Sequence, residues 1–226
     1  MIIRREYRGF LKCPKETEPA EAFEEAAAQA FLQAKERAGQ AVREGRLLTA
    51  SLYRHENMCF FYEEALGEEN SLLPCLECLT PFLESWPTEA GPAPWAYMYP
   101  IFYHQRPEDP ESWMAGRQGE KNRVGRIAFL YPDKVFSYTY WHKALVDEGL
   151  LLGDRYQFIS LHENILFSYF EEPRSAVNLS GSKAPSRAIE GWMAADPESH
   201  FDREKAGGDN FLVIDQVWTV GGERER

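Results

Sequence analysis

A tyrosine and a histidine four residues apart, Tyr138 and His142, are the side chains whose types and spacing most directly indicate chemistry. Residues at this spacing on a helix lie on one face and contact each other. Because the ordinary pKa of histidine is about 6.5, an imidazole can give or take a proton at neutral pH. The pair therefore predicts general acid–base catalysis, with His142 as acid or base and Tyr138 orienting it or the ligand. A hydrogen-bonded core histidine is the alternative.

A helix with one apolar face must carry these two residues, and the segment 133–148 has that periodicity. Its inward stripe consists of Val135, Tyr138, His142, Leu145 and Val146. When the Glu-Gly pairs at 44–45 and 148–149 are aligned, the equivalent positions of an earlier helix are all apolar, namely Phe31, Ala34, Ala38, Ala41 and Val42. Since buried polar groups lose solvation, polar residues on one stripe alone predict a cavity that holds polar ligand atoms or water.

Two stretches spell nearly the same hairpin, SLYRHENMCFFYEE at 51–64 and ISLHENILFSYFEE at 159–172. Each lies within the order strand, helix, two strands, helix, strand, which is the βαββαβ order of a ferredoxin-like unit. We therefore predict an α+β fold in which two tandem ferredoxin-like units pack sheet to sheet as an intramolecular α+β barrel. His55 and His162 fall where the chain reverses and are expected to be turn residues.

The predicted boundaries follow the composition of the chain. Repeat 1 covers 1–105, and repeat 2, which carries the candidate site, covers 124–226. The segment 106–123 between them is dense in proline, glycine and charge, as linkers are, but Trp113 suggests that part of it packs onto a domain. Because the second repeat supplies the partner sheet within the chain, the barrel needs no second copy; further oligomerisation stays open.

The charge of the chain argues against a nucleic-acid partner. The net charge is −11 and the isoelectric point is near 5.0, whereas a phosphate backbone attracts clustered lysine and arginine. No apolar run approaches the roughly 20 residues of a membrane helix, and the amino-terminal MIIRREYRGF turns polar too soon for a secretory signal. We therefore expect a cytoplasmic protein whose partner is a small molecule rather than a membrane.

Cysteine usage predicts neither a metal site nor a redox site. Cys75 and Cys78 have the CxxC spacing, but no second CxxC and no paired histidine accompany them. In a reducing compartment they are expected to be thiols that pack as small hydrophobic residues. No metal is expected from this pattern.

Further candidates for the ligand site come from the second helix and the strands of repeat 2. Asp196 and Pro197 read as a cap and a first helical position, which would restart the helix there. The residues expected to line the same cavity are Trp192, His200 and Phe201 from the helical region, and Tyr156, Tyr169 and Asp215 from the strands. Trp192 also fits an ordinary core position, and the strand face that Tyr169 occupies is left open by the sequence.

The second half resembles the L-rhamnose mutarotase family, small ferredoxin-like proteins that pair into dimeric α+β barrels. The resemblance covers 124–220 and rests on YTYWHKALVDEG, ISLHENILFSYFEE and LVIDQVW. It implies a sugar site with Tyr138 and His142, and an isomerase that interconverts the anomers of a monosaccharide without a cofactor. That family's tryptophan pair is replaced here by ESHFDRE, so His200 or Phe201 would take its place.

Two alternatives accompany this mutarotase hypothesis. GWMAADPESHF is similar to the second-helix pattern of antibiotic-biosynthesis-type monooxygenases on the same fold, which implies oxygen chemistry on a phenolic substrate, or haem degradation. The other alternative is a barrel that binds a ligand without catalysis. Monosaccharide binding, oxygen uptake with quinols and a Soret band on haem addition distinguish the three.

Overall fold

The computed structural model describes the whole chain except residues 15–18, 90, 118–120, 178–183 and 223–226. Its contacts group the chain into two compact units. Unit 1 comprises Met1–Tyr97, Pro107–Arg117 and Asp215–Arg226, and unit 2 comprises Met98–Arg106 and Gln118–Ile214. Each unit combines helices with an antiparallel sheet, so the predicted α+β class is confirmed.

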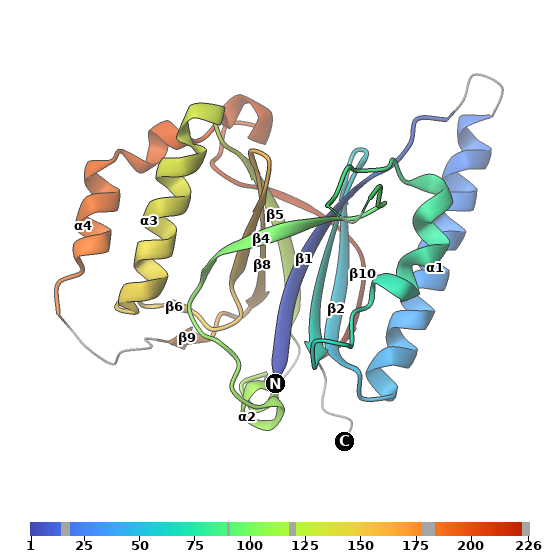
Figure 1. Cartoon of the computed structure of the whole chain (residues 1–226), viewed down its shortest axis with the longest axis horizontal. Coiled ribbons are helices and arrows are strands. Elements are labelled where there is room, and N and C mark those ends of the chain that lie inside the picture. Colours follow the sequence, from blue (N-terminus) through green and yellow to red (C-terminus); the bar gives the residue numbers. More distant parts are fainter. Residues whose placement is uncertain (15–18, 90, 118–120, 178–183, 223–226) are drawn as a thin grey trace. The chain divides into compact units, whose positions relative to one another are not determined.

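The eight long strands follow the hydrogen-bonded order β1-β3-β2-β10-β5-β8-β7-β4 of a closed antiparallel barrel, as expected. Most of these strands are labelled in Figure 1. Their bounds are β1 Ile2–Phe10, β2 Leu47–His55, β3 Met58–Leu66, β4 Ala96–Tyr103, β5 Asn122–Phe129, β7 Phe158–His162, β8 Ile165–Glu172 and β10 Leu212–Gly221. The short strands β6 (Gly153–Asp154) and β9 (Ala176–Val177) form a separate pair.

The strands that close the two predicted repeats pair with strands of the other half of the sequence, and β10 also pairs within its own half. β4, from the first half of the sequence, pairs with β7 of unit 2. β10 pairs with β5 through its first residues and with β2 through Asp215–Gly221. The units therefore do not coincide with the predicted segments 1–105, 106–123 and 124–226. Alternating apolar residues predict that a segment is a strand. They do not predict which strand it pairs with, because register and packing decide that.

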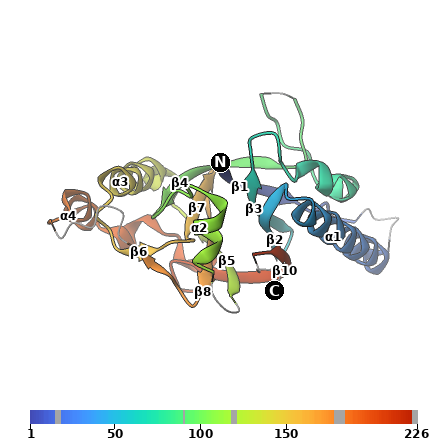
Figure 2. The same ribbon diagram turned by 90° about the horizontal axis from the view of Figure 1, so that it is seen from below.

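Unit 1 is covered by α1 (Ala20–Arg43), which runs along its sheet (Figure 2). The predicted apolar stripe of this helix is confirmed, because Phe31, Ala34, Ala38 and Ala41 are buried and Val42 packs partly buried against them. In place of the second helix of the first predicted unit lies a 3-10 helix, Leu73–Phe82, in which Pro81 lacks the N–H that an α-helical bond requires. Cys75 and Cys78 pack on the core from this segment, as the sequence predicted.

Part of the predicted linker folds as the helix α2 (Pro110–Ala115). The Asp109 side chain caps it by accepting a hydrogen bond of 2.9 Å from the backbone N–H of Ser112. Trp113 is only 2% exposed, so the linker does pack onto unit 1.

In unit 2, α3 (Val135–Glu148) and α4 (Arg187–Ala194) lie side by side in both views (Figures 1 and 2). The carboxylate of Glu148 joins them, because it accepts hydrogen bonds from the backbone N–H groups of Arg187 (2.9 Å) and Ala188 (3.2 Å) at the start of α4. A helical segment begins again at Asp196 and Pro197, as expected, but it is the 3-10 helix Pro197–His200.

Both His-Glu-Asn segments are chain reversals, as expected, but His55 and His162 are the last residues of β2 and β7, and the turns themselves consist of the Glu-Asn pairs at 56–57 and 163–164. The left-handed conformation falls on the glutamates, Glu56 (φ 51°) and Glu163 (φ 57°), rather than on the histidines. The Asn164 amide donates a hydrogen bond of 2.7 Å to the carbonyl of Leu130, which fixes the second turn against β5.

Gly191 lets α4 approach α3 closely, because a Cβ at this position would overlap the ring of Trp141. We expect Gly191→Ala to lower the free energy of unfolding by about 1–3 kcal/mol, the usual range for overpacking. Gly39→Ala is the matched control, since this glycine lies inside α1 with only the flexible end of Arg43 at 3.4 Å. It should raise stability by about 0.5–1 kcal/mol. Equal effects of the two changes in urea unfolding would contradict this packing.

Candidate active site

Tyr138 and His142 lie together inside unit 2, as their spacing predicted. Their rings stack with centroids 3.8 Å apart at 17°. Tyr138 is 1% exposed and His142 is 9% exposed. Trp192 meets both rings edge-on, at 5.5 Å from Tyr138 and 4.9 Å from His142. Phe102 of β4 closes the other side of the imidazole at 5.4 Å. The histidine is therefore enclosed by aromatic rings.

The hydrogen bond of His142 defines its tautomer. Nδ1 lies 2.9 Å from the backbone carbonyl of Tyr138, and a carbonyl only accepts, so Nδ1 carries the proton. Burial lowers the pKa of His142 to about 4, although the bond to the carbonyl opposes this and His200 adds to it. At neutral pH the imidazole is uncharged, and its Nε2 presents a lone pair.

The phenol of Tyr138 is held in its protonated form. Burial raises the pKa of Tyr138 well above its ordinary value, while the positive charge of Arg126 acts in the opposite direction. Tyr138 can therefore donate a hydrogen bond at neutral pH and does not act as a base.

His200 and Phe201 join the cluster but differ in what they offer. Nδ1 of His200 donates to the carbonyl of Asp196 (3.0 Å), and Nε2 accepts from the hydroxyl of Ser137 (3.0 Å). Since both nitrogens are used, His200 holds the 3-10 helix to the start of α3 and is not available to a ligand. The Phe201 ring lies 5.7 Å from Tyr138.

Three predicted ligand residues lie outside this cluster. Tyr169 alternates with Leu166 of the helix-side core, so it points to the opposite sheet face, where its hydroxyl donates to Glu171 at 2.7 Å. Tyr156 is buried beside Asp154, whose carboxylate accepts from its backbone N–H at 3.4 Å. Asp215 is exposed and belongs to unit 1. Strand parity does not reveal which face carries the helices, so the sequence could not place Tyr169. Tyr156 lies in a turn before β7 rather than in a strand, and Asp215 lies where β10 changes its pairing partner.

The tyrosine–glutamate pair of β8 has a counterpart in β3. The Tyr62 hydroxyl donates to Glu64 at 2.7 Å and accepts from Arg4 at 2.8 Å. Arg117, next to α2, binds Glu64 with both terminal nitrogens, at 2.7 and 2.9 Å. Neither side chain of this ion pair is exposed. Burial would raise the pKa of Glu64, but the attraction and hydrogen bonds of Arg117 outweigh it and lower that pKa to about 2.

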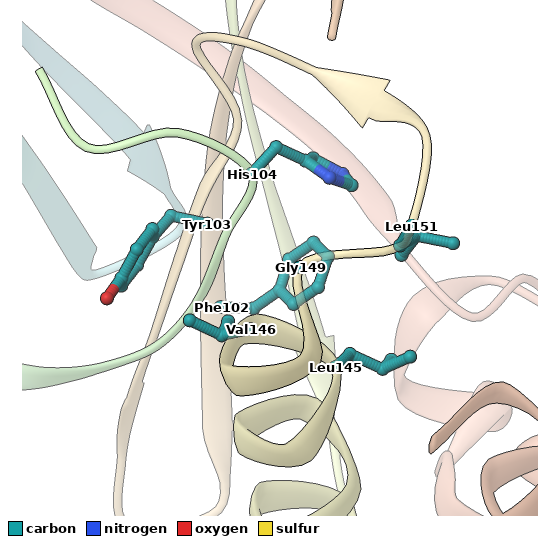
Figure 3. Close-up of a pocket in the computed structure, with 7 residues that line it drawn as sticks. All are labelled: Phe102, Tyr103, His104, Leu145, Val146, Gly149 and Leu151. Carbon is teal, nitrogen blue, oxygen red and sulfur yellow. The ribbon is translucent and has the colours of Figure 1, made fainter. Parts of the chain in front are cut away.

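A small cavity lies at the carboxyl end of α3, next to the enclosed histidine. It is lined by Phe102, Tyr103, His104, Leu145, Val146, Gly149 and Leu151, and its volume is about 10 Å³ (Figure 3). That volume holds about one water molecule. In Figure 3 the His104 imidazole points toward Leu151, whereas the Tyr103 hydroxyl points away from both. Of the aromatic side chains around His142, Trp192 is only partly buried, whereas Tyr138 and Phe102 are buried.

Sequence reasoning missed two groups of polar residues. His104 of the first half lies near Asp154, and burial lowers the pKa of His104 while the Asp154 charge raises it. Arg126 of β5 lies between aromatic rings near Tyr138. A polar residue at an inward position of an apolar strand was a signal for Arg126. Nothing local in the sequence connects His104 with Asp154.

Among the described residues, no group of three or more histidine, cysteine, aspartate or glutamate side chains is placed to hold a metal ion. Within the same part of the chain, no helix has both the length and the apolar character needed to cross a bilayer.

No protein-family model matches the chain, and no curated protein sequence matches it. Among solved structures it is similar to a proposed monooxygenase of Fusobacterium nucleatum, with 9% identity over 97% of this chain and 94% of that one and a TM-score of 0.42. It is also similar to a proposed monooxygenase of Lactobacillus acidophilus, with 7% identity, 97% and 96% coverage and a TM-score of 0.44. A third is the chlorite dismutase of Candidatus Nitrospira defluvii, with 13% identity, 94% and 90% coverage and a TM-score of 0.37. Identities this low carry no information on activity.

Proposed function

We propose that unit 2 binds a planar phenolic or quinol-like molecule against the Tyr138–His142 pair and supports its oxygenation. The observation that carries this proposal is a neutral imidazole with its Nε2 lone pair, enclosed by aromatic rings. Aromatic side chains around a few polar groups suit a flat apolar ligand with one hydrogen-bonding edge. Trp192 is the side chain that a substrate ring would stack on or displace.

A monosaccharide fits this site less well, which leaves the mutarotase hypothesis with little support. Each sugar hydroxyl that enters a buried site needs a partner, or its desolvation is not offset. In the cluster, both His200 nitrogens and Nδ1 of His142 are already used within the protein. The hydroxyl of Tyr138 and Nε2 of His142 are too few for a molecule with several hydroxyl groups.

The proposed reaction takes its electrons from the substrate alone. A ring CH₂ flanked by aromatic carbons loses one proton to give a carbanion stabilised as its phenolate. Oxygen accepts the electron pair and forms a C–O bond, which gives a hydroperoxide after protonation. Loss of the second C–H proton then breaks the O–O bond and leaves a ketone and water, so that R₂CH₂ + O₂ gives R₂CO + H₂O. His142 Nε2 takes the proton and returns it to the departing oxygen. Because a pKa of about 4 makes His142 a weak base, the substrate must itself be acidic.

Oxygen uptake with anthrone, which carries such a CH₂ group, tests this proposal. We expect His142→Ala to reduce uptake by about 100-fold or more, the usual contribution of a positioned acid or base. His142→Gln keeps an acceptor but cannot take a proton, and it should be equally inactive. His55→Ala, which removes a histidine at a turn of unit 1, should leave uptake unchanged. Uptake that survives His142→Ala would refute the assigned role.

Two further measurements separate the alternatives. Polarimetry with monosaccharides should detect no acceleration of anomer interconversion, and haem addition should give no new Soret band. Either signal, if abolished by His142→Ala, would replace the proposed oxygenation with mutarotation or haem chemistry. Silence in every assay would favour a barrel that binds ligands without catalysis.

A further inference from the structure

Arg126 is a cation held between aromatic rings on the helix side of the unit 2 sheet. Its guanidinium carbon lies 4.2 Å from the centre of the Phe211 ring and 5.1 Å from that of Phe170. Nε lies 3.4 Å from the hydroxyl of Ser168 on the neighbouring strand β8. This arrangement fixes the plane of the guanidinium and leaves its terminal nitrogens for another partner.

No carboxylate forms an ion pair with Arg126 among the residues that the structure describes. The charged or titratable groups that act on it are Arg174, which lies 4.6 Å over the other packing partner Phe170, and Tyr138. Burial lowers the pKa of Arg126, and the charge of Arg174 lowers it further. A half-buried cation without a paired anion loses hydration that one hydroxyl and two aromatic rings replace only in part.

A chain of ring contacts links Arg126 to the candidate active site. Phe211, which covers the guanidinium, lies 5.8 Å from Phe201, and Phe201 lies 5.7 Å from Tyr138. The charge of Arg126 also acts on the hydroxyl of Tyr138, where it favours the phenolate against the effect of burial. The field of Arg126 therefore reaches a phenol oxygen that belongs to the site.

We propose that Arg126 is the oxyanion-binding residue of the unit 2 site, and that its ligand is an acidic phenol or enol bound as the anion. This inference rests on the proposed function and adds the charge state of the substrate. Paired N–H groups of a guanidinium bind an oxyanion through charge-assisted hydrogen bonds. His142 is a weak base, so it can remove a proton only from a substrate whose anion is stabilised. The guanidinium of Arg126 would supply that stabilisation.

The test uses 4-nitrophenol, whose phenolate absorbs visible light while the neutral phenol does not. Titration of the probe with and without the full-length protein gives the pKa of the free and bound phenol. A positive charge within hydrogen-bonding range lowers the pKa of an acid by about 1–3 units. We therefore expect binding to raise the ionisation constant of the probe at least tenfold, a shift toward phenolate. Arg126→Gln should abolish that shift, and Arg126→Lys should restore part of it.

Arg174→Gln is the matched control, because Arg174 contacts the same Phe170 ring but is exposed. It should change the shift much less than Arg126→Gln. Nitrobenzene, which lacks the acidic hydroxyl, should bind the wild-type protein and the Arg126→Gln variant equally. A bound probe whose pKa is unchanged, a shift that survives Arg126→Gln, or no binding of the probe would each overturn the proposal. If Arg126→Gln fails to fold, the wild-type shift and the Arg126→Lys variant decide the outcome.

The two proposals fail in different ways. A phenolate shift that depends on Arg126 but comes without oxygen uptake would retain the oxyanion site and remove the oxygenase. Oxygen uptake that depends on His142 but is equal in wild type and Arg126→Gln, without a phenolate shift, would retain the oxygenase and remove the role of Arg126.

Discussion

Replacing Arg117 by alanine should lower the free energy of unfolding by about 3–5 kcal/mol, the range for breaking a buried ion pair from one side. Arg117 binds both oxygens of Glu64, and neither side chain is exposed. Its removal leaves a buried carboxylate whose low pKa depended on that guanidinium. Tyr62 and Arg4 still reach this network, but they do not replace a two-point contact. Urea unfolding measures the effect.

Two variants show whether this effect comes from the isolated charge. Arg54→Ala breaks the more exposed pair with Glu24 in the same unit and should lower stability by only about 0–1 kcal/mol. The double change Glu64→Gln with Arg117→Met removes both charges while keeping bulk, and it should recover most of the loss. If Arg117→Ala and Arg54→Ala have equal effects, the Glu64 pair is not the buried anchor of unit 1 that its geometry indicates.

Lowering the pH from 7 to 4 should reduce the free energy of unfolding through His142 by about 3 kcal/mol. Its pKa is about 4 in the folded protein, whereas the unfolded chain has the ordinary value of about 6.5. Between these values the unfolded state binds a proton that the folded state refuses. Acid therefore stabilises the unfolded state, so folding stability is retained above the unfolded pKa and lost as pH falls toward the folded one.

The difference between wild type and His142→Gln isolates this contribution. His104 has a lowered pKa and acts in the same direction, and Glu64 adds acid sensitivity below its ordinary pKa, from about 4.5 toward 2. Both stay in the variant, so they cancel in the comparison. We expect the stability gap between the two proteins to change by about 3 kcal/mol between pH 7 and pH 4. A constant gap would mean that His142 is solvated and titrates normally.

The helix that carries the candidate site was accessible to sequence reasoning because its signal is local. A helical period places Tyr138 and His142 on one face whatever surrounds them, and the stacked rings follow from that spacing. The same reasoning put Trp192, His200 and Phe201 near them, since the restart at Asp196 and Pro197 is also local. The hydrogen bonds that use both nitrogens of His200 could not be read from spacing.

The positions of the candidate residues on the strands could not be predicted, for a different reason. Alternation shows that Tyr169 and Leu166 face opposite sides, but the sequence does not say which side the helices cover. The same limit applied to Asp215, which lies where β10 leaves β5 and pairs with β2. The predicted tandem duplication stays a prediction, although the Tyr-x-Glu pairs at Tyr62 and Tyr169 make the same hydrogen bond.

The sequence by itself determined the α+β class, the turns at the two His-Glu-Asn segments, and the tyrosine–histidine pair on one helical face. These features depend on backbone preferences and on residues within a few positions of one another. Only the tertiary structure decided that His142 is neutral, that Arg126 lies between aromatic rings, and that β4 pairs with β7 and β10 with β2. Burial, charge environment and strand partners arise from residues far apart in the chain, and the spacing along the sequence does not encode them.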